Sequence, residues 1–406
     1  MNLKAYKILA HIFFLLSLTA CQHKTQVQAA PWGDDTASDT TSLGTIRENG
    51  EMIMLTLNGP ETYYEYHGRN LGPHYMLCEK LAEHLGVTLR VDLCKDTLDM
   101  LQRLRDGEGD IICFPSTKKM KEDFITVGND GWLVAPGDTA LMKAIDAWYK
   151  PNMLTDVRKE ETRLLSTASV KRHVYPFMIS AEKGTISTYD NLFKKYASVA
   201  QMDWQLLAAQ CYQESCFDPK AHSWAGACGL MQIMPSTADM LSLPRERIYD
   251  PEANVAAAAR YMAQLQQKFS DVGNPAERLK FALAAYNGGY NHVRDAMALT
   301  KKYGGIWQRW DDVKRYILAL QQSQFYRDPV VNSGYMRGSE TSAYVDMITQ
   351  RHAQYREAIR TGKPIKSAVA RPTSSLTKSA VTQEVNIGLS DAAPHRARRQ
   401  NKWRKN

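Results

Sequence analysis

The chain has 406 residues, which is enough for two or three domains. Hydrophobic residues make up 44% and charged residues 23%, as is typical of chains that build packed cores. This composition excludes a wholly disordered protein, a collagen-like rod and a small disulfide-stapled domain. Only the first stretch of the chain is apolar enough to meet a bilayer, which excludes a polytopic membrane protein.

The N-terminus is typical of an export signal. Residues 1–20 contain Lys4 and Lys7 followed by an apolar run over 8–18. The segment ends in Leu-Thr-Ala-Cys21, which resembles the bacterial lipobox. That resemblance implies cleavage before Cys21 and acylation of its thiol and new amine, which gives a durable lipid anchor. A plain secretory signal that happens to be followed by a cysteine is the alternative.

The implied location is the cell envelope, with the protein anchored in the outer membrane and facing the periplasm. Residues 21–44 have few apolar side chains and are predicted to form a flexible tether. Six cysteines remain after Cys21, and an oxidising compartment permits disulfides among them. A Cys216–Cys228 disulfide is predicted, with two small buried thiols as the alternative. No cysteine has the spacing of a zinc site, so no metal is expected.

The net charge of +8 comes from the two ends of the chain. Residues 363–406 carry ten Lys or Arg against two acids, and residues 1–20 carry +2, which leaves −2 for residues 21–362. The basic tail, 363–406, has no apolar periodicity and is predicted to be disordered. Outside the cytoplasm nucleic acid is not an expected partner; anionic lipid or the carboxylates of peptidoglycan are alternatives to a purely solvated tail.

Residues 45–152 alternate strand and helix patterns. Strands are predicted at 52–57, 87–93 and 110–114, and helices at 74–85, which Gly86 ends, and at 97–104. Strands separated by helices of this length predict βαβ units on a mostly parallel sheet.

This order of elements resembles the first lobe of the family 3 periplasmic solute-binding proteins. The resemblance is carried by residues 58–64, 81–87 and 104–110. The chain then runs almost directly from Phe124 to 131–134, the predicted return to the same lobe, so there is no room for a second lobe. A clamp that closes on a soluble ligand needs both jaws. Two interpretations remain: an open half-site for a cell-wall peptide, lined by Tyr63, Tyr64 and Tyr66, or a structural spacer.

Residues 153–183 are predicted to be a linker with one helical stretch. Beyond it, helices are predicted at 189–197 and 204–214. Glu214 ends the apolar face that contains Leu206, Leu207, Gln210 and Cys211. A buried carboxyl has a raised pKa and becomes a proton donor near neutrality, whereas an exposed glutamate at a helix end has no such role.

Three motifs follow in order: Glu-Ser-Cys-Phe at 214–217, Gly-Leu-Met-Gln-Ile-Met-Pro at 229–235 and Ala-Tyr-Asn-Gly-Gly at 285–289. This set resembles the catalytic domain of the Slt-type soluble lytic transglycosylases, which belong to the goose-lysozyme-like superfamily. The resemblance covers residues 184–362 and implies a mainly α, lysozyme-like domain. The predicted fold class is therefore α+β multidomain, with one α/β solute-binding-protein-like lobe before the lysozyme-like domain.

The resemblance also implies residue roles. Glu214 is the single catalytic acid and base. Substrate-binding roles fall on Ser223 at the acetamido side, Met231 and Gln232 in the floor, and Tyr286 and Asn287 in the facing wall. The segment 334–345 resembles the last motif of the family, whose tyrosine steadies the glutamate, and this places that role on Tyr344.

The implied substrate is peptidoglycan, cleaved at the β-1,4 bond between N-acetylmuramic acid and N-acetylglucosamine. One carboxylate suffices when the 6-hydroxyl of the muramyl residue attacks and closes a 1,6-anhydro ring, with no cofactor. A hydrolytic lysozyme needs a second carboxylate. The nearby acids are better explained as structural, Asp218 in a turn and Asp203 as a helix N-cap. A hydrolytic lysozyme and a catalytically inactive protein that binds or senses the cell wall are the two alternatives.

Overall fold

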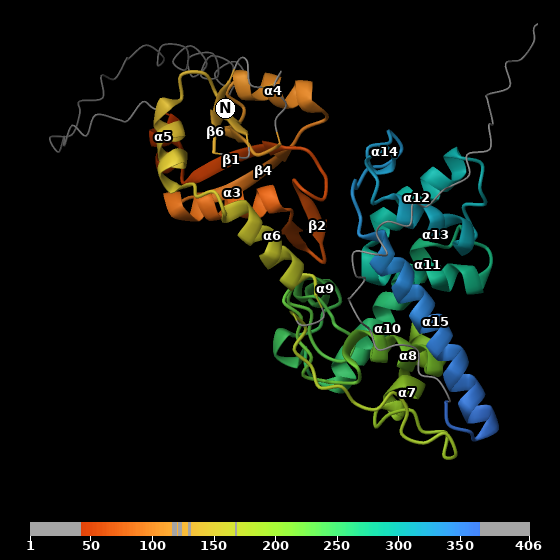
Figure 1. The fold of residues 1–406 in the computed structure, drawn as a ribbon. Coiled ribbons are helices and arrows are strands. Elements are labelled where there is room, and N and C mark those ends of the chain that lie inside the picture. Colours follow the sequence, from red (N-terminus) through yellow and green to blue (C-terminus); the bar gives the residue numbers. More distant parts are fainter. Residues whose placement is uncertain (1–41, 116–119, 121–123, 129–130, 167–168, 366–406) are drawn as a thin grey trace, which may run out of the picture. The chain divides into compact units, whose positions relative to one another are not determined.

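The structure is a computed structural model that describes residues 42–115, 120, 124–128, 131–166 and 169–365 (Figure 1). The predicted signal peptide, Cys21 and nearly all of the basic tail lie outside this part of the chain. Within it, no helix is both long enough and apolar enough to cross a membrane. Helix α2 (Ser42–Asn49) begins inside the predicted tether, because Leu43 and Ile46 are buried against the lobe that follows.

The N-terminal lobe contains a five-stranded sheet in the order β4-β1-β5-β7-β6. The strands are β1 (Glu51–Thr56), β4 (Thr88–Leu93), β5 (Ile111–Ile112), β6 (Ile125–Val127) and β7 (Trp132–Val134). β1 pairs in parallel with β4 and β5, which confirms the βαβ prediction. β7 is antiparallel to both of its neighbours and returns the chain to this sheet, as predicted.

Helices cover both faces of this sheet (Figure 1). Along β1, Met52 and Met54 belong to one hydrophobic cluster and Leu55 to the other, because successive side chains of a strand point to opposite faces. Helix α3 (Pro73–Leu85) packs on the first face and α4 (Thr97–Arg105) on the second. Gly86 ends α3 in the left-handed conformation, as the sequence predicts.

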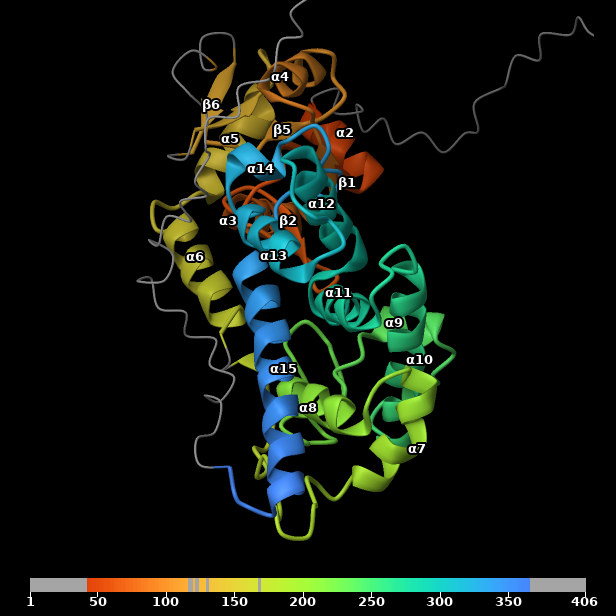
Figure 2. The same ribbon diagram turned by 90° about the vertical axis from the view of Figure 1, so that its right-hand side faces the viewer.

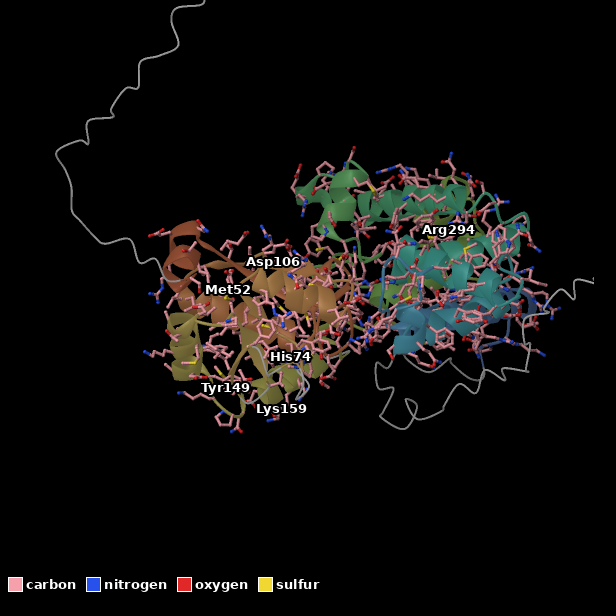
Figure 3. The ribbon with its side chains drawn as sticks, turned by 90° about the horizontal axis from the view of Figure 1, so that it is seen from above. Met52, His74, Asp106, Tyr149, Lys159 and Arg294 are labelled. Carbon is pink, nitrogen blue, oxygen red and sulfur yellow. The ribbon has the colours of Figure 1, made fainter. Side chains whose placement is uncertain are left out.

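Two further helices complete the lobe. α5 (Thr139–Trp148) packs against β6, and α6 (Met153–Leu164), which lies in the range predicted as a linker, packs against α3. Buried His74 on α3, labelled in Figure 3, accepts a hydrogen bond of 2.8 Å from Trp132 Nε1. Lys159, also labelled there, lies on the exposed face of α6.

The three tyrosines considered for a peptide groove lie on or next to a separate hairpin, β2 (Tyr64–Tyr66) and β3 (Arg69–Leu71). Each hydroxyl donates a hydrogen bond within the chain: Tyr63 to Asn70, Tyr64 to Glu161 and Tyr66 to Glu340. These contacts favour a structural role for the tyrosines over a peptide groove.

The C-terminal domain is helical, as predicted. Its helices are α7 (Asp190–Ala200), α8 (Trp204–Ser215), α9 (Pro235–Met240), α10 (Pro251–Lys268), α11 (Pro275–Gly288), α12 (Tyr290–Lys302), α13 (Trp310–Ala319), α14 (Ser323–Tyr326) and α15 (Gly338–Thr361), with a short 3₁₀ turn at Arg245–Arg247. α15 runs alongside α8 and also packs on α11 and α13 (Figure 2). This packing brings the last motif of the sequence to the end of the first.

The predicted Cys216–Cys228 disulfide is wrong in this structure. All six cysteines of the described residues are buried and free. Cys216 caps α8 in the left-handed conformation, while the Cys228 sulfur lies 3.5 Å from His222 Nδ1 and 3.2 Å from the carbonyl oxygen of Gly226. The alternative of small buried thiols is therefore the one observed.

Candidate active site

Glu214 lies in the last turn of α8. The helix begins at Asp203, whose carboxylate accepts from the backbone N–H of Gln205, as the sequence predicts for an N-cap. It ends at Ser215, before Pro219, because Cys216 and Phe217 both adopt positive φ angles of 54° and 63°. Burial raises the pKa of the half-buried Glu214 carboxyl to about 7, because ionisation there loses hydration. A carboxyl with this pKa holds a proton near neutrality and can release it.

Tyr344, on α15, lies directly against this carboxyl. Its hydroxyl is 2.5 Å from Glu214 Oε1. Burial raises the pKa of Tyr344 well above its usual value, so the hydroxyl stays protonated and acts as the donor. Arg172 is a second contact that the sequence did not reveal: its guanidinium donates a 3.0 Å hydrogen bond to the backbone oxygen of Glu214. A cation at a helix C-terminus stabilises the carbonyls that lack partners there.

The loop after α8 carries Ser223. Its hydroxyl oxygen accepts from the backbone N–H of Ala227 at 2.9 Å, and its own N–H donates to the carbonyl of Ala227. Gly226 adopts φ +100° within this tight turn, a conformation that favours glycine. The hydroxyl hydrogen of Ser223 takes no part in these two bonds, so it can donate to a substrate.

Met231 and Gln232 follow in a second loop. Met231 is fully buried, and its carbonyl accepts from the Tyr286 hydroxyl at 2.7 Å. Gln232 adopts φ +49°, and its side-chain amide donates to the carbonyls of Ala221 and Gly229. The Gln232 amide therefore ties this second loop to the first, close to Ser223.

Asn254, on α10, is the functional support that the sequence analysis missed. It lies in the first turn of this helix, which Asp250 caps, and no motif of the sequence marks it. In the structure, Asn254 is fully buried, accepts from the Met231 N–H at 2.8 Å, and donates to the carbonyls of Cys228 and Ile248. Two of its partners, Met231 and Cys228, lie 23 and 26 positions away in the sequence. Only the Gly-Leu-Met-Gln loop at 229–232, whose backbone groups need partners, hinted at the role.

The end of α11 carries Tyr286 and Asn287, the two residues predicted for the facing wall of the site. Tyr286 is fixed by its bond to Met231, and Asn287 Oδ1 accepts from the Thr341 hydroxyl at 2.7 Å. Because its oxygen is held by Thr341, the Asn287 amide presents its N–H groups as donors. The structure thus links the predicted residues in separate contacts: Tyr344 on α15 with Glu214 on α8, Tyr286 on α11 with the Met231 backbone, and Asn287 on α11 with α15 through Thr341. Ser223 and Gln232 make their hydrogen bonds within the two loops.

Neither Asp218 nor Glu340 is free to act as a nucleophile or base. Asp218 is buried and accepts hydrogen bonds from the backbone N–H groups of His173 and Lys220. Glu340 accepts from Tyr66, and although burial opposes ionisation, His67, Arg337 and Tyr66 hold its pKa at about 2. Among the residues that the structure describes, no cluster of three or more His, Cys, Asp or Glu side chains is placed to hold a metal ion.

Comparison with known proteins identifies a related domain in this chain. The transglycosylase SLT domain family matches residues 191–307. A protein from Desulfosudis oleivorans named membrane-bound lytic murein transglycosylase F is 28% identical over 425 aligned positions, covering 78% of this chain and 92% of the relative. A protein of the same name from Serratia proteamaculans is 42% identical over 53% of this chain, which spans only 44% of that relative.

Among solved structures, the 70 kDa soluble lytic transglycosylase SLT70 from Escherichia coli is 30% identical over 42% of this chain and 24% of its own length, with a TM-score of 0.29. The chain therefore contains a transglycosylase SLT domain and is a lytic transglycosylase, similar to the membrane-bound lytic murein transglycosylase F proteins.

Proposed function

We propose that this enzyme cleaves the β-1,4 bond between N-acetylmuramic acid and N-acetylglucosamine in peptidoglycan without consuming water. The names of its relatives and its SLT domain support the substrate class. The observation that carries the mechanism is one carboxyl, Glu214, with a pKa of about 7 and a tyrosine hydroxyl bound to one of its two oxygens.

In the first half of the reaction, protonated Glu214 donates its proton to the glycosidic oxygen, and the bond from that oxygen to the anomeric carbon breaks. Positive charge develops at the anomeric carbon, and the acetamido oxygen of the same sugar traps it. Tyr344 stabilises the carboxylate that Glu214 has become, because a hydroxyl donates more strongly to a charged acceptor than to a neutral one.

In the second half, the Glu214 carboxylate takes the proton of the muramyl 6-hydroxyl. The 6-oxygen attacks the anomeric carbon, the bond from that carbon to the acetamido oxygen breaks, and the 1,6-anhydro ring closes. The proton taken from the 6-hydroxyl returns Glu214 to its acid form. Attack from within the substrate has a high effective concentration and competes well with water. Ser223, Gln232, Tyr286 and Asn287 bind and orient the glycan, and Met231 forms the apolar floor. Asp218, the nearest acid in sequence, is occupied by backbone donors, which disfavours a hydrolytic lysozyme.

The test is mass spectrometry of the muropeptides that the protein releases from purified peptidoglycan, run beside Glu214→Gln. Expected products lack one water and resist borohydride reduction, and the variant releases none. Reducible ends would show a hydrolase instead. No release by the folded wild-type protein would favour a binding or sensing role.

We also propose that acylated Cys21 anchors the enzyme to the outer membrane, facing the periplasm. The lipobox-like sequence and the membrane-bound relatives support this proposal. Cys21→Ser is expected to move the protein from the membrane fraction to the soluble fraction without loss of activity on isolated glycan. Retention of the variant in the membrane fraction would contradict the anchor.

A further inference from the structure

Gln210 is a polar side chain in the apolar core, one helical turn before Glu214 on α8. It is fully buried, as are its neighbours Leu206 and Leu207. Its amide nitrogen lies 3.3 Å from the Tyr344 hydroxyl and 3.7 Å from the sulfur of Met262. Its amide oxygen is buried and has no hydrogen-bond partner in the described part of the chain.

An amide in this position does not serve folding. A buried acceptor without a partner costs about 1–3 kcal/mol relative to a satisfied one. An apolar side chain of similar volume, such as methionine, would fill the same space without that cost. The contact that the amide does make leads directly to the catalytic carboxyl.

The hydrogen atoms available fix which group donates in each of the two hydrogen bonds that link Gln210, Tyr344 and Glu214. The Tyr344 hydroxyl has one hydrogen and two lone pairs. Its hydrogen points to Glu214 Oε1 at 2.5 Å, so the contact with the Gln210 nitrogen must be accepted by the Tyr344 oxygen. Because Oε1 of Glu214 is occupied as an acceptor, the proton of the acid form resides on Oε2.

We infer that Gln210 is a positioning residue of the catalytic site: its amide donates to the Tyr344 oxygen, keeps the Tyr344 hydroxyl directed at Glu214, and so confines the transferable proton to Oε2. Without this donor, the Tyr344 oxygen is open to accept the proton of Glu214, and the hydroxyl can rotate. Both changes leave the acid in an orientation that cannot protonate the glycosidic oxygen. The inference rests on the proposed role of Glu214 as the catalytic acid.

Gln210 also polarises the Tyr344 hydroxyl. Donation to the Tyr344 oxygen makes its O–H a stronger donor, which stabilises the ionised form of Glu214. Removal of the Gln210 amide is therefore expected to raise the pKa of Glu214, in the same direction as removal of the Tyr344 hydroxyl.

The test uses Gln210→Met and Gln210→Leu in the full chain, with soluble uncrosslinked glycan strands as the substrate. The matched control is Gln266→Met. Gln266 is a buried glutamine on α10 whose amide donates a 2.7 Å hydrogen bond to the carbonyl of Ala200 rather than to Tyr344. We expect the Gln210 variants to lower kcat about three- to tenfold while KM stays within about twofold, and to move the alkaline limb of the pH profile up by about half a unit. Their melting temperature is expected to stay equal or rise, whereas Gln266→Met lowers it and leaves the pH profile unchanged.

A double variant tests whether Gln210 acts through the Tyr344 hydroxyl or only through packing in the core. In a Tyr344→Phe background, Gln210→Met is expected to cause no further shift of the alkaline limb, because the hydroxyl it acts through is absent. An unchanged kcat and pH profile in the single Gln210 variants, or a loss of kcat that only follows a loss of stability, would overturn the inference. Glu214→Gln distinguishes a failure of the proposed function from a failure of the Gln210 inference. If Glu214→Gln retains wild-type activity, the proposed function fails. If it is inactive while the Gln210 variants are normal, only the role of Gln210 fails.

Discussion

The Tyr344 hydroxyl lies 2.5 Å from Glu214 Oε1, although the two residues are 130 positions apart in the sequence. The packing of α15 on α8 creates this contact. It occupies one carboxyl oxygen and leaves the other for the glycosidic bond. The proposed mechanism depends on this division.

The pH dependence of activity follows from Glu214 as the starting acid. Burial raises its pKa to about 7, so the active, protonated form is lost as the pH rises through that value. We expect kcat/KM to fall about tenfold for each pH unit above the pKa of Glu214, measured by release of soluble product from glycan strands. An alkaline limb near pH 4.5, the usual value of a glutamate, would contradict the buried acid.

Stability is expected to respond to the same group. A carboxyl whose pKa is raised in the folded state stabilises the fold fully below the unfolded value and loses that contribution as the pH rises through about 7. Glu214→Gln removes the cost of burying the charge, so it is expected to raise the melting temperature at pH 8 and change it little at pH 4. Calorimetry at both pH values checks this, and an equal effect at both would contradict the assignment.

Tyr344→Phe removes the donor while keeping the ring. Hydrogen bonds to charged groups contribute about 1.5–3 kcal/mol, so kcat is expected to fall roughly ten- to a hundredfold. Because the carboxylate loses its donor, the alkaline limb is expected to move to higher pH. Tyr355→Phe is the matched control: this tyrosine is also buried on α15, but it donates to the carbonyl of Phe177. The control is expected to lose stability and keep the pH profile; a shared shift would refute the specific role of Tyr344.

Asn254→Ala is expected to loosen the Met231 loop. The amide makes three hydrogen bonds to backbone groups of this region, and leaving buried partners unsatisfied costs about 1–3 kcal/mol for each group. We expect a drop of several kcal/mol in the free energy of unfolding, measured in denaturant, together with a loss of activity. Asn274→Ala removes only the N-cap of α11 and is expected to cost about 1 kcal/mol. Equal losses in the two variants would argue against the support that we assign to Asn254.

Gly229→Ala tests how closely that loop approaches α10. Gly229 adopts φ +78°, and an added Cβ would lie 2.7 Å from Asn254 Nδ2 and 2.9 Å from the carbonyl oxygen of Ile248. Gly86 has nearly the same φ, +76°, with no atom within 4 Å of an added Cβ. Gly86→Ala is expected to cost about 1 kcal/mol for the backbone conformation alone, and Gly229→Ala about 1–3 kcal/mol more. Equal costs would show that the contact with Asn254 is not tight.

Much of the fold follows from local patterns. The spacing of Leu77, Leu81 and Leu85 predicted α3, and the apolar run after Gly86 predicted β4, because helices and strands bury their faces with different periods. The helix that begins at Asp203 was predicted from its cap and apolar face. Its predicted end at residue 214 is one residue before the observed end at Ser215, but the positive φ angles of Cys216 and Phe217 were not predicted, because they depend on the packing around them.

The site residues were predicted from motifs, while the contacts between them were not. Resemblance placed Glu214 and Tyr344 in the site, and the structure brings them into contact. Asn254 and Gln210 act through partners 23 and 134 positions away, and no local period encodes such distances. The Cys216–Cys228 prediction was wrong for a similar reason, because two cysteines that are close in the sequence need not have their sulfur atoms facing each other.

The most direct test of the mechanism is to digest peptidoglycan with the wild-type protein in water enriched in oxygen-18 and to weigh the products. An intramolecular attack by the 6-hydroxyl takes no oxygen from the solvent, so every new muramyl end is expected to carry only natural-abundance oxygen. A gain of about 20 mass units per new end, which is one labelled water, would show hydrolysis and contradict the single-carboxylate mechanism centred on Glu214.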